Sequence, residues 1–231
     1  MLIIGHRGAM GYAPENTLAS FRKALQLQVD MIEFDVYALH DGSVVVIHDP
    51  FVNRTTNGSG MVMKKSLKEL RALDAGDGEK IPTLQEVLDV VGKKAKVNIE
   101  LKGKHSAAPV ATIIKHYVEK KQWNYEDFLV SSFSRSELKQ IEQIAPEIPR
   151  SLLTIQGISP FIDIGFAKKI GAKAVSPWSK YINALFVSAA HRKGLNVYVY
   201  TVNTTEEALR MKKLGVDGIF TNYPDLVKSV L

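Results

Sequence analysis

Short apolar runs alternate with amphipathic stretches along almost the whole chain. The apolar runs are five to nine residues long and rich in Val and Ile, a composition typical of β-strands. We expect strands at residues 2–6, 29–37, 43–48, 96–102, 128–133, 150–154, 173–177, 196–202 and 217–221. The stretches between them repeat apolar residues at helical spacing. We expect helices at residues 15–27, 83–91, 107–120, 135–144, 160–170, 182–193, 204–214 and 223–230.

This alternation of strands and helices predicts a mainly parallel sheet covered by helices. About eight strand–helix units in 231 residues favour a closed (β/α)8 TIM barrel over an open doubly wound sheet. No G-x-G-x-x-G motif follows the first strand, which argues against a dinucleotide-binding fold. We therefore expect one α/β barrel domain that spans residues 1–231.

The alternation is interrupted after the third apolar run. Residues 49–82 are rich in Gly, Asn and Asp, which signal turns, as in Asn57-Gly58 and Asp77-Gly78. A loop of this length in a compact domain is usually functional or disordered. We interpret residues 49–82 as an ordered insertion over one end of the barrel.

Charge and cysteine content narrow the classes of ligand. The formal net charge is +6, which favours anionic ligands such as phosphates. Lys and Arg are scattered, and their small groups lack the interleaved aromatic residues of single-strand binders, so we expect no nucleic-acid partner. Without cysteine there is no disulfide framework and no thiolate ligand. Any metal must therefore be bound by oxygen or imidazole.

The N-terminus and the helical stretches bear on location. The apolar run Leu2–Ile4 is too short for a signal peptide or a membrane span, and no basic stretch precedes it. We expect a cytoplasmic protein, with a secreted protein whose leader has been removed as the alternative. No amphipathic anchor is evident, so we expect no stable membrane association.

Polar residues occupy one face of two predicted strands. In residues 29–37, Glu33 and Asp35 alternate with apolar side chains, and in residues 96–102 Glu100 does the same. Parallel strands are covered on both faces, so these carboxylates should point into the barrel, where a divalent cation would relieve their repulsion. Their hard oxygens suit Mg²⁺ or Ca²⁺ better than Zn²⁺. The alternatives are half-exposed antiparallel strands, or a solvated or ion-paired cluster that involves Lys102.

Two histidines and two basic residues complete the candidate chemistry. His6 and His48 end predicted strands, where barrel enzymes place their reactive groups, and are a candidate general acid and base. Arg7 has forked donors suited to phosphate oxygens, with an ion pair to Glu15 or Asp35 as the alternative. Lys102 would add positive charge on the face that carries Glu100.

These segments, in this order and spacing, resemble the glycerophosphodiester phosphodiesterase family from residue 4 to about residue 224. The matching motifs are His6-Arg7-Gly8, Pro14-Glu15-Asn16-Thr17, Glu33-Phe34-Asp35, His48-Asp49, Asn53–Gly58, Asn98-Ile99-Glu100-Leu101-Lys102, Thr201-Val202-Asn203 and Gly215–Gly218. Any one of them is weak evidence, but the ordered set is specific.

The resemblance implies a (β/α)8 barrel with a small insertion after the His-Asp motif. It implies hydrolysis of glycerophosphodiesters, such as glycerophosphocholine or glycerophosphoethanolamine, to sn-glycerol 3-phosphate and an alcohol. It further implies one divalent cation, Mg²⁺ or Ca²⁺ with Mn²⁺ as a further option. The implied residues are the metal ligands Glu33, Asp35 and Glu100, the acid/base pair His6 and His48, and the phosphate contacts Arg7 and Lys102. Asn98, on the same strand face as Glu100, would support the metal ligands.

The chain departs from the family at two positions. Tyr200 stands where members often have tryptophan at the substrate pocket, and Asn222 where they often have aspartate. Phe133 and Trp178 follow predicted strands and are expected, with Tyr200, to bind the glycerol or head-group side of the substrate. Packing of Phe133 and Trp178 beneath the loops is the alternative.

Three questions stay open at this point. Either water or the neighbouring glycerol hydroxyl, through a cyclic phosphate, could be the nucleophile. The two histidines are not assigned to acid and base. A lysophospholipase D-type or phospholipase C-like enzyme on the same barrel, or a non-catalytic metal- or phosphate-binding barrel, are the alternative functions.

Overall fold

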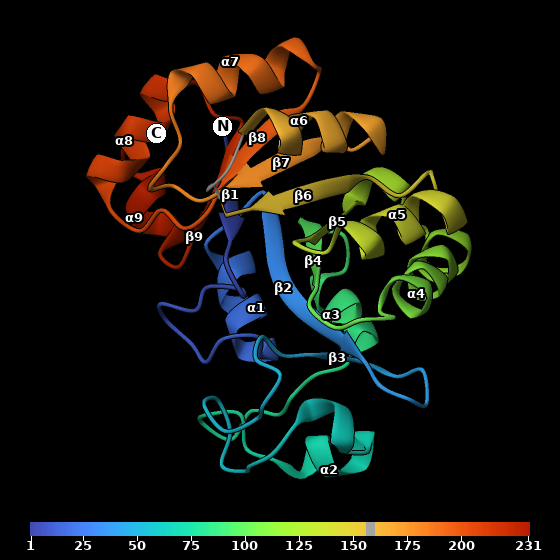
Figure 1. Ribbon diagram of the computed structural model, residues 1–231. Helices are drawn as coiled ribbons and strands as arrows, with labels where there is room; N and C mark the ends of the chain where they lie inside the picture. The colour runs from blue at the N-terminus through green and yellow to red at the C-terminus, as the bar shows by residue number, and fades with distance from the viewer. Residues whose placement is uncertain (156–159) are drawn as a thin grey trace.

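A ring of eight parallel strands forms the centre of the protein, and helices cover its outside (Figure 1). The computed structural model describes residues 1–155 and 160–231. The ring closes where β1 pairs with both β2 and β9. Its strands are β1 (Leu2–Gly5), β2 (Met31–Ala38), β4 (Lys96–Leu101), β5 (Phe128–Ser132), β6 (Arg150–Thr154), β7 (Ala174–Pro177), β8 (Asn196–Val199) and β9 (Gly218–Thr221). The predicted (β/α)8 barrel is confirmed.

Each barrel strand is followed along the chain by one of the covering helices, in one case after the insertion of residues 49–82. Several helices begin at a Ser or Thr whose side-chain oxygen accepts a hydrogen bond from a backbone N–H three residues later, as at Thr17 and Thr83. Helices α4 and α5 have the predicted bounds. The covering helices are α1 (Leu18–Gln26), α3 (Leu84–Val91), α4 (Ala107–Lys120), α5 (Arg135–Ile144), α6 (Pro160–Lys169), α7 (Ala184–Arg192), α8 (Thr205–Leu214) and α9 (Pro224–Lys228). A 3-10 turn, η2 (Tyr125–Asp127), precedes β5.

The alternation along β2 places its side chains as predicted. Phe34, between Ile32 and Val36, points outward into the core between sheet and helices, where its ring meets that of Phe21 on α1 at 5.5 Å. A smaller apolar cluster, which includes Met31, fills the inside of the barrel. Glu33 and Asp35 follow Met31 on the inward face. The polar residues of β2 therefore gather toward the C-terminal mouth of the barrel.

Strand β3 (Val44–Val46) is not a barrel strand, which corrects the interpretation of residues 43–48. It pairs antiparallel with the C-terminal end of β2, with Val46 opposite Val36. The reason is a tight turn at Asp41–Ser43, where Gly42 has φ 84° and Asp41 accepts a hydrogen bond from the Ser43 N–H. His48 therefore does not end a barrel strand. It comes back to the mouth because this hairpin reverses the chain.

The segment between β3 and α3 packs around a small apolar core that it shares with residues of β2 and β3. Residues 49–82 contain the 3-10 turn η1 (Val62–Lys64) and helix α2 (Leu67–Ala72), and α2 lies apart from the helices around the barrel (Figure 1). Val62 and Leu70 are fully buried in this cluster. The division of residues 1–231 into one domain with an insertion stays a prediction. Within the described ranges, no helix combines the length and apolar character needed to span a bilayer.

Candidate active site

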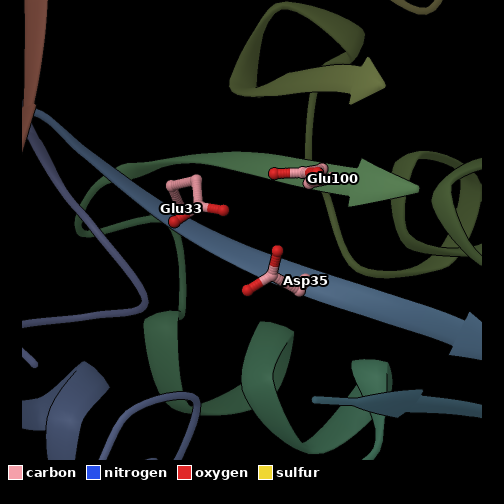
Figure 2. Close-up of side chains that lie close together, drawn as sticks. All are labelled: Glu33, Asp35 and Glu100. Carbon is pink, nitrogen blue, oxygen red and sulfur yellow. The ribbon is translucent and has the colours of Figure 1, made fainter. Parts of the chain in front are cut away.

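Three carboxylates meet inside the mouth of the barrel. Glu33 and Asp35 come from β2 and Glu100 from β4, and Figure 2 shows their carboxyl groups turned toward one another. The parallel register sets Asp35 opposite Glu100, so the alternation of both strands points these side chains the same way. One oxygen of each lies within 4.8 Å of the others. All three residues are buried.

Burial makes this cluster electrostatically unfavourable without a cation. Burial, together with the charges of Asp35 and Glu100, raises the pKa of Glu33 well above its usual value. Burial and the charge of Asp35 raise the pKa of Glu100 to about 7. Lys102 Nζ lies 2.8 Å from Glu100 and Arg7 Nε lies 3.4 Å from Asp35, so two basic groups face three acidic ones. One negative charge remains, and a divalent cation would outweigh it.

The donor set of the cluster fits a hard divalent cation. Asn16 holds Asp35 by donating its amide to Oδ2 at 2.9 Å, while Oδ1 is buried without a hydrogen-bond partner among the described residues. The backbone N–H of Arg7 donates a hydrogen bond to one carboxylate oxygen of Glu33 at 2.8 Å. The cluster thus combines fixed carboxylates with an oxygen of Asp35 that accepts no hydrogen bond from the described residues, which suits a Mg²⁺ or Ca²⁺ site. Asn98, paired with Glu33 across the strands, is also buried, and its side chain makes no hydrogen bond to the part of the chain that the structure describes.

His6 continues β1 and faces the same pocket. Its backbone N–H donates to the Thr221 carbonyl at 2.9 Å, which extends the barrel ladder by one residue. Its Nδ1 lies 2.7 Å from the side-chain oxygen of Asn222. Because an amide oxygen can only accept, Nδ1 carries the proton and Nε2 keeps its lone pair. Burial of the ring and the charge of Arg7 lower the pKa of His6 to about 4.

His48 has a different partner. Its Nδ1 lies 2.5 Å from the carboxylate of Asp49, and its Nε2 lies 3.1 Å from Lys102 Nζ. The two histidines of the pocket therefore have different partners, an amide oxygen at His6, and a carboxylate and an ammonium group at His48.

One further residue, Arg54, connects the histidine loops and was not predicted. Its guanidinium binds both oxygens of Glu15 and both oxygens of Asp49. Glu15 in turn binds Arg7 at 2.7 Å. The ion pairs proposed as alternatives for Arg7, to Glu15 and to Asp35, are thus both present, and they hold the guanidinium at the pocket.

Most of the predicted residues surround one cavity of about 170 Å³. Asp35 lies behind its wall, and Trp178 does not line it. Trp178 forms a β-bridge with Tyr200 and packs edge-on against Tyr181, so its role in substrate binding stays a prediction. The lining residues are His6, Arg7, Glu33, His48, Glu100, Lys102, Ser131, Phe133, Leu153, Tyr200, Thr201 and Phe220.

Comparison with known proteins decides the family. Residues 6–226 match the model of the glycerophosphoryl diester phosphodiesterase family. The chain belongs to this family.

Full-length relatives agree with the assignment. A glycerophosphodiester phosphodiesterase from Caldanaerobacter subterraneus is 38% identical and covers 100% of this chain and 97% of its own. One from Bacillus altitudinis is 37% identical, covering 96% of this chain and 95% of its own. A solved phosphodiesterase from Oleispira antarctica, in complex with the product sn-glycerol 3-phosphate, superposes with a TM-score of 0.90 at 29% identity, over 100% of this chain and 96% of its own. This glycerophosphoryl diester phosphodiesterase is therefore a hydrolase of glycerophosphodiesters.

Proposed function

We propose that this enzyme hydrolyses glycerophosphodiesters to sn-glycerol 3-phosphate and an alcohol with the help of one divalent cation. The observation that carries the proposal is the convergence of three buried carboxylates and two histidines on one pocket. Glu33, Asp35 and Glu100 would hold the cation, with Mg²⁺ or Ca²⁺ preferred and Mn²⁺ as a further option. When bound, the cation offsets the charge of the carboxylates and of the phosphodiester.

Arg7 and Lys102 would bind the phosphate oxygens, because both line the pocket and carry positive charge beside the carboxylate cluster. Phe133 and Tyr200 form the wall on which a substituent of the phosphate would lie, and Trp178 extends that wall beyond Tyr200. The Oleispira antarctica relative was solved with the product sn-glycerol 3-phosphate, which supports a small glycerophosphodiester as the substrate. The cytoplasmic location, the absence of stable membrane association and the absence of a nucleic-acid partner stay predictions.

The partners of the two histidines support a different role for each. His6, kept neutral by its burial and oriented by Asn222, would accept the proton of the nucleophile through Nε2. His48, beside the Asp49 carboxylate, would give its proton to the leaving alcohol. This proton would be carried on Nε2 of His48, which Lys102 Nζ contacts at 3.1 Å. The Lys102 ammonium would therefore have to turn toward the phosphate when Nε2 is protonated.

The test of the proposed function is a coupled assay for glycerol 3-phosphate. We expect release from several glycerophosphodiesters, loss of activity in excess chelator, and recovery with Mg²⁺, Mn²⁺ or Ca²⁺. Full activity in excess chelator would remove the cation from the mechanism. Lysophosphatidylcholine, measured beside glycerophosphocholine, separates the lysophospholipase D alternative, because only that enzyme would prefer the acylated substrate.

Asn222→Asp is expected to shift the acidic limb of the pH profile. His6 acts as a base only when neutral, and its pKa of about 4 leaves it neutral at all higher pH values. A carboxylate 2.7 Å from Nδ1 would favour the imidazolium and raise that pKa. The acidic limb of kcat/KM should therefore move toward neutral pH by about one unit or more.

Asn183→Asp, at the N-cap of α7, is the control for the added charge, since aspartate serves equally well as an N-cap. Its pH profile should match that of the wild type. An unchanged acidic limb in Asn222→Asp would show that His6 is not the base.

A further inference from the structure

Side-chain exposure divides the lining of the pocket into a rim and a floor. The groups proposed to bind the phosphate and to protonate the leaving alcohol are partly accessible, with exposed fractions of 14% for Arg7, 17% for Lys102 and 29% for His48. By contrast, Phe220 is 2% exposed and Ser131 is fully buried, although both line the cavity. We therefore place the charged groups at the rim and these two residues at the floor.

The floor combines apolar side chains with a hydroxyl group. Leu153 on β6 and Phe220 on β9 are both buried and line the cavity. Ser131 on β5 stands between Leu129, which belongs to the apolar cluster inside the barrel, and Phe133, which lines the pocket. Alternation along the strand therefore points Ser131 inward with its two neighbours.

The hydroxyl group of Ser131 is left without a protein partner. Its Oγ is buried and makes no hydrogen bond to any of the described residues. The parallel register sets Ser131 between Glu100 on β4 and Ser151 on β6, and Ser151 Oγ pairs with Ser176 Oγ at 2.9 Å. A buried hydroxyl without a partner costs free energy, so a polar group that enters the cavity and binds Ser131 offsets that cost.

The charges of the pocket decide which part of the substrate reaches the floor. The anionic phosphate is stabilised by Arg7 and Lys102 at the rim, while Leu153, Phe220 and Ser131 carry no charge to balance it. His48, the proposed proton donor to the leaving alcohol, is also at the rim, which places that alcohol there. The glycerol moiety is then the uncharged part of the substrate directed to the floor.

We propose that Ser131 binds a hydroxyl group of the glycerol moiety and is a specificity-determining residue for glycerol. The proposal rests on the proposed hydrolysis of glycerophosphodiesters and deepens it. Leu153 and Phe220 contact the carbon chain of the glycerol, and Ser131 recognises one of its two free hydroxyl groups. A ligand without that hydroxyl leaves Ser131 buried and unpaired, and is therefore bound less tightly.

The experiment measures dissociation constants by titration calorimetry in excess Mg²⁺. The ligands are sn-glycerol 3-phosphate, 3-hydroxypropyl phosphate, which lacks the middle hydroxyl, and 2-hydroxypropyl phosphate, which lacks the terminal one. Binding is measured rather than turnover because a glycerol hydroxyl is one of the two candidate nucleophiles. We expect the wild type to bind one analogue more weakly than sn-glycerol 3-phosphate by roughly fivefold or more.

Ser131→Ala should weaken binding of sn-glycerol 3-phosphate by a similar factor and leave the dissociation constant of that one analogue nearly unchanged. The variant removes a group without a protein partner, so the fold should be kept. Equal losses for all three ligands, or no loss for sn-glycerol 3-phosphate, would overturn the proposal.

Ser151→Ala is the matched control, because Ser151 is a buried serine beside Ser131 in the register but does not line the cavity. Its three dissociation constants should match those of the wild type, and a loss confined to the same hydroxyl as in Ser131→Ala would also overturn the proposal. The proposed function is tested separately, since a failure to cleave any glycerophosphodiester in the coupled assay contradicts it whatever the calorimetry shows.

Discussion

Replacing either histidine of the pocket with alanine is expected to lower kcat by roughly 100-fold or more. His6→Ala removes the neutral nitrogen that faces the pocket, and His48→Ala removes the imidazole held by Asp49. Both rings sit at the mouth of the barrel rather than in its apolar core, so the fold should persist. Steady-state kinetics in the coupled assay, with circular dichroism on the same samples, measure the two effects separately.

The control for these variants is His116→Ala. His116 lies on the exposed side of α4, and its removal should leave kcat unchanged. A wild-type rate in either pocket variant would show that the histidine in question has been given the wrong role. Equal losses of secondary structure and of activity would point to folding rather than chemistry.

Glu33→Gln is expected to change activity and stability in opposite directions. The variant loses a cation ligand, so kcat/KM at a fixed Mg²⁺ concentration should fall by roughly 100-fold or more. In the cation-free protein, the same change removes a buried charge that repels Asp35 and Glu100. The free energy of unfolding of that form should therefore rise, by on the order of 1 kcal/mol.

The pH dependence of the cation-free protein follows from the same charges. The pKa of Glu33 and that of Glu100 are raised in the folded state, Glu100 to about 7, so folding favours their protonated forms. This contribution to stability is present below the ordinary glutamate pKa and is lost as pH rises through the folded pKa. Thermal melts in chelator should show the wild type losing stability between about pH 5 and 8 more steeply than Glu33→Gln.

Glu126→Gln is the control for both measurements, because Glu126 is exposed in the turn before β5. It should neither weaken cation dependence nor stabilise the cation-free protein. If Glu33→Gln destabilised that form, the carboxylates would not be in the mutually repulsive arrangement on which the cation site depends.

The periodicity of the sequence predicts the barrel because apolar residues recur at every second position in most strands and at helical spacing in most helices. Glu33 and Asp35 could be placed inside the mouth for the same reason, since alternation along one strand decides which side a residue faces. The hairpin of β3 was missed although Asp41-Gly42 between apolar runs is a hairpin signal. Helix α2 was missed too, although Ser66 and Glu69 form a capping box.

Contacts between distant segments could not be predicted in this way. The bond between His6 and Asn222 joins the two ends of the chain, and no local pattern encodes it. Arg54 lies in a turn-rich stretch whose position relative to Glu15 depends on the tertiary fold.

The ion pairs of Arg54 with Glu15 and Asp49 have a consequence for chimeras made from two relatives. Its guanidinium joins the segment after β3 to the loop after β1, so each histidine loop is positioned partly by the other. A chimera that imports a foreign segment in place of residues 49–82 must therefore bring compatible side chains at positions 15, 49 and 54 together. A segment without an arginine at position 54 would remove one of the two arginines that bind Glu15, and with it the link between the two histidine loops.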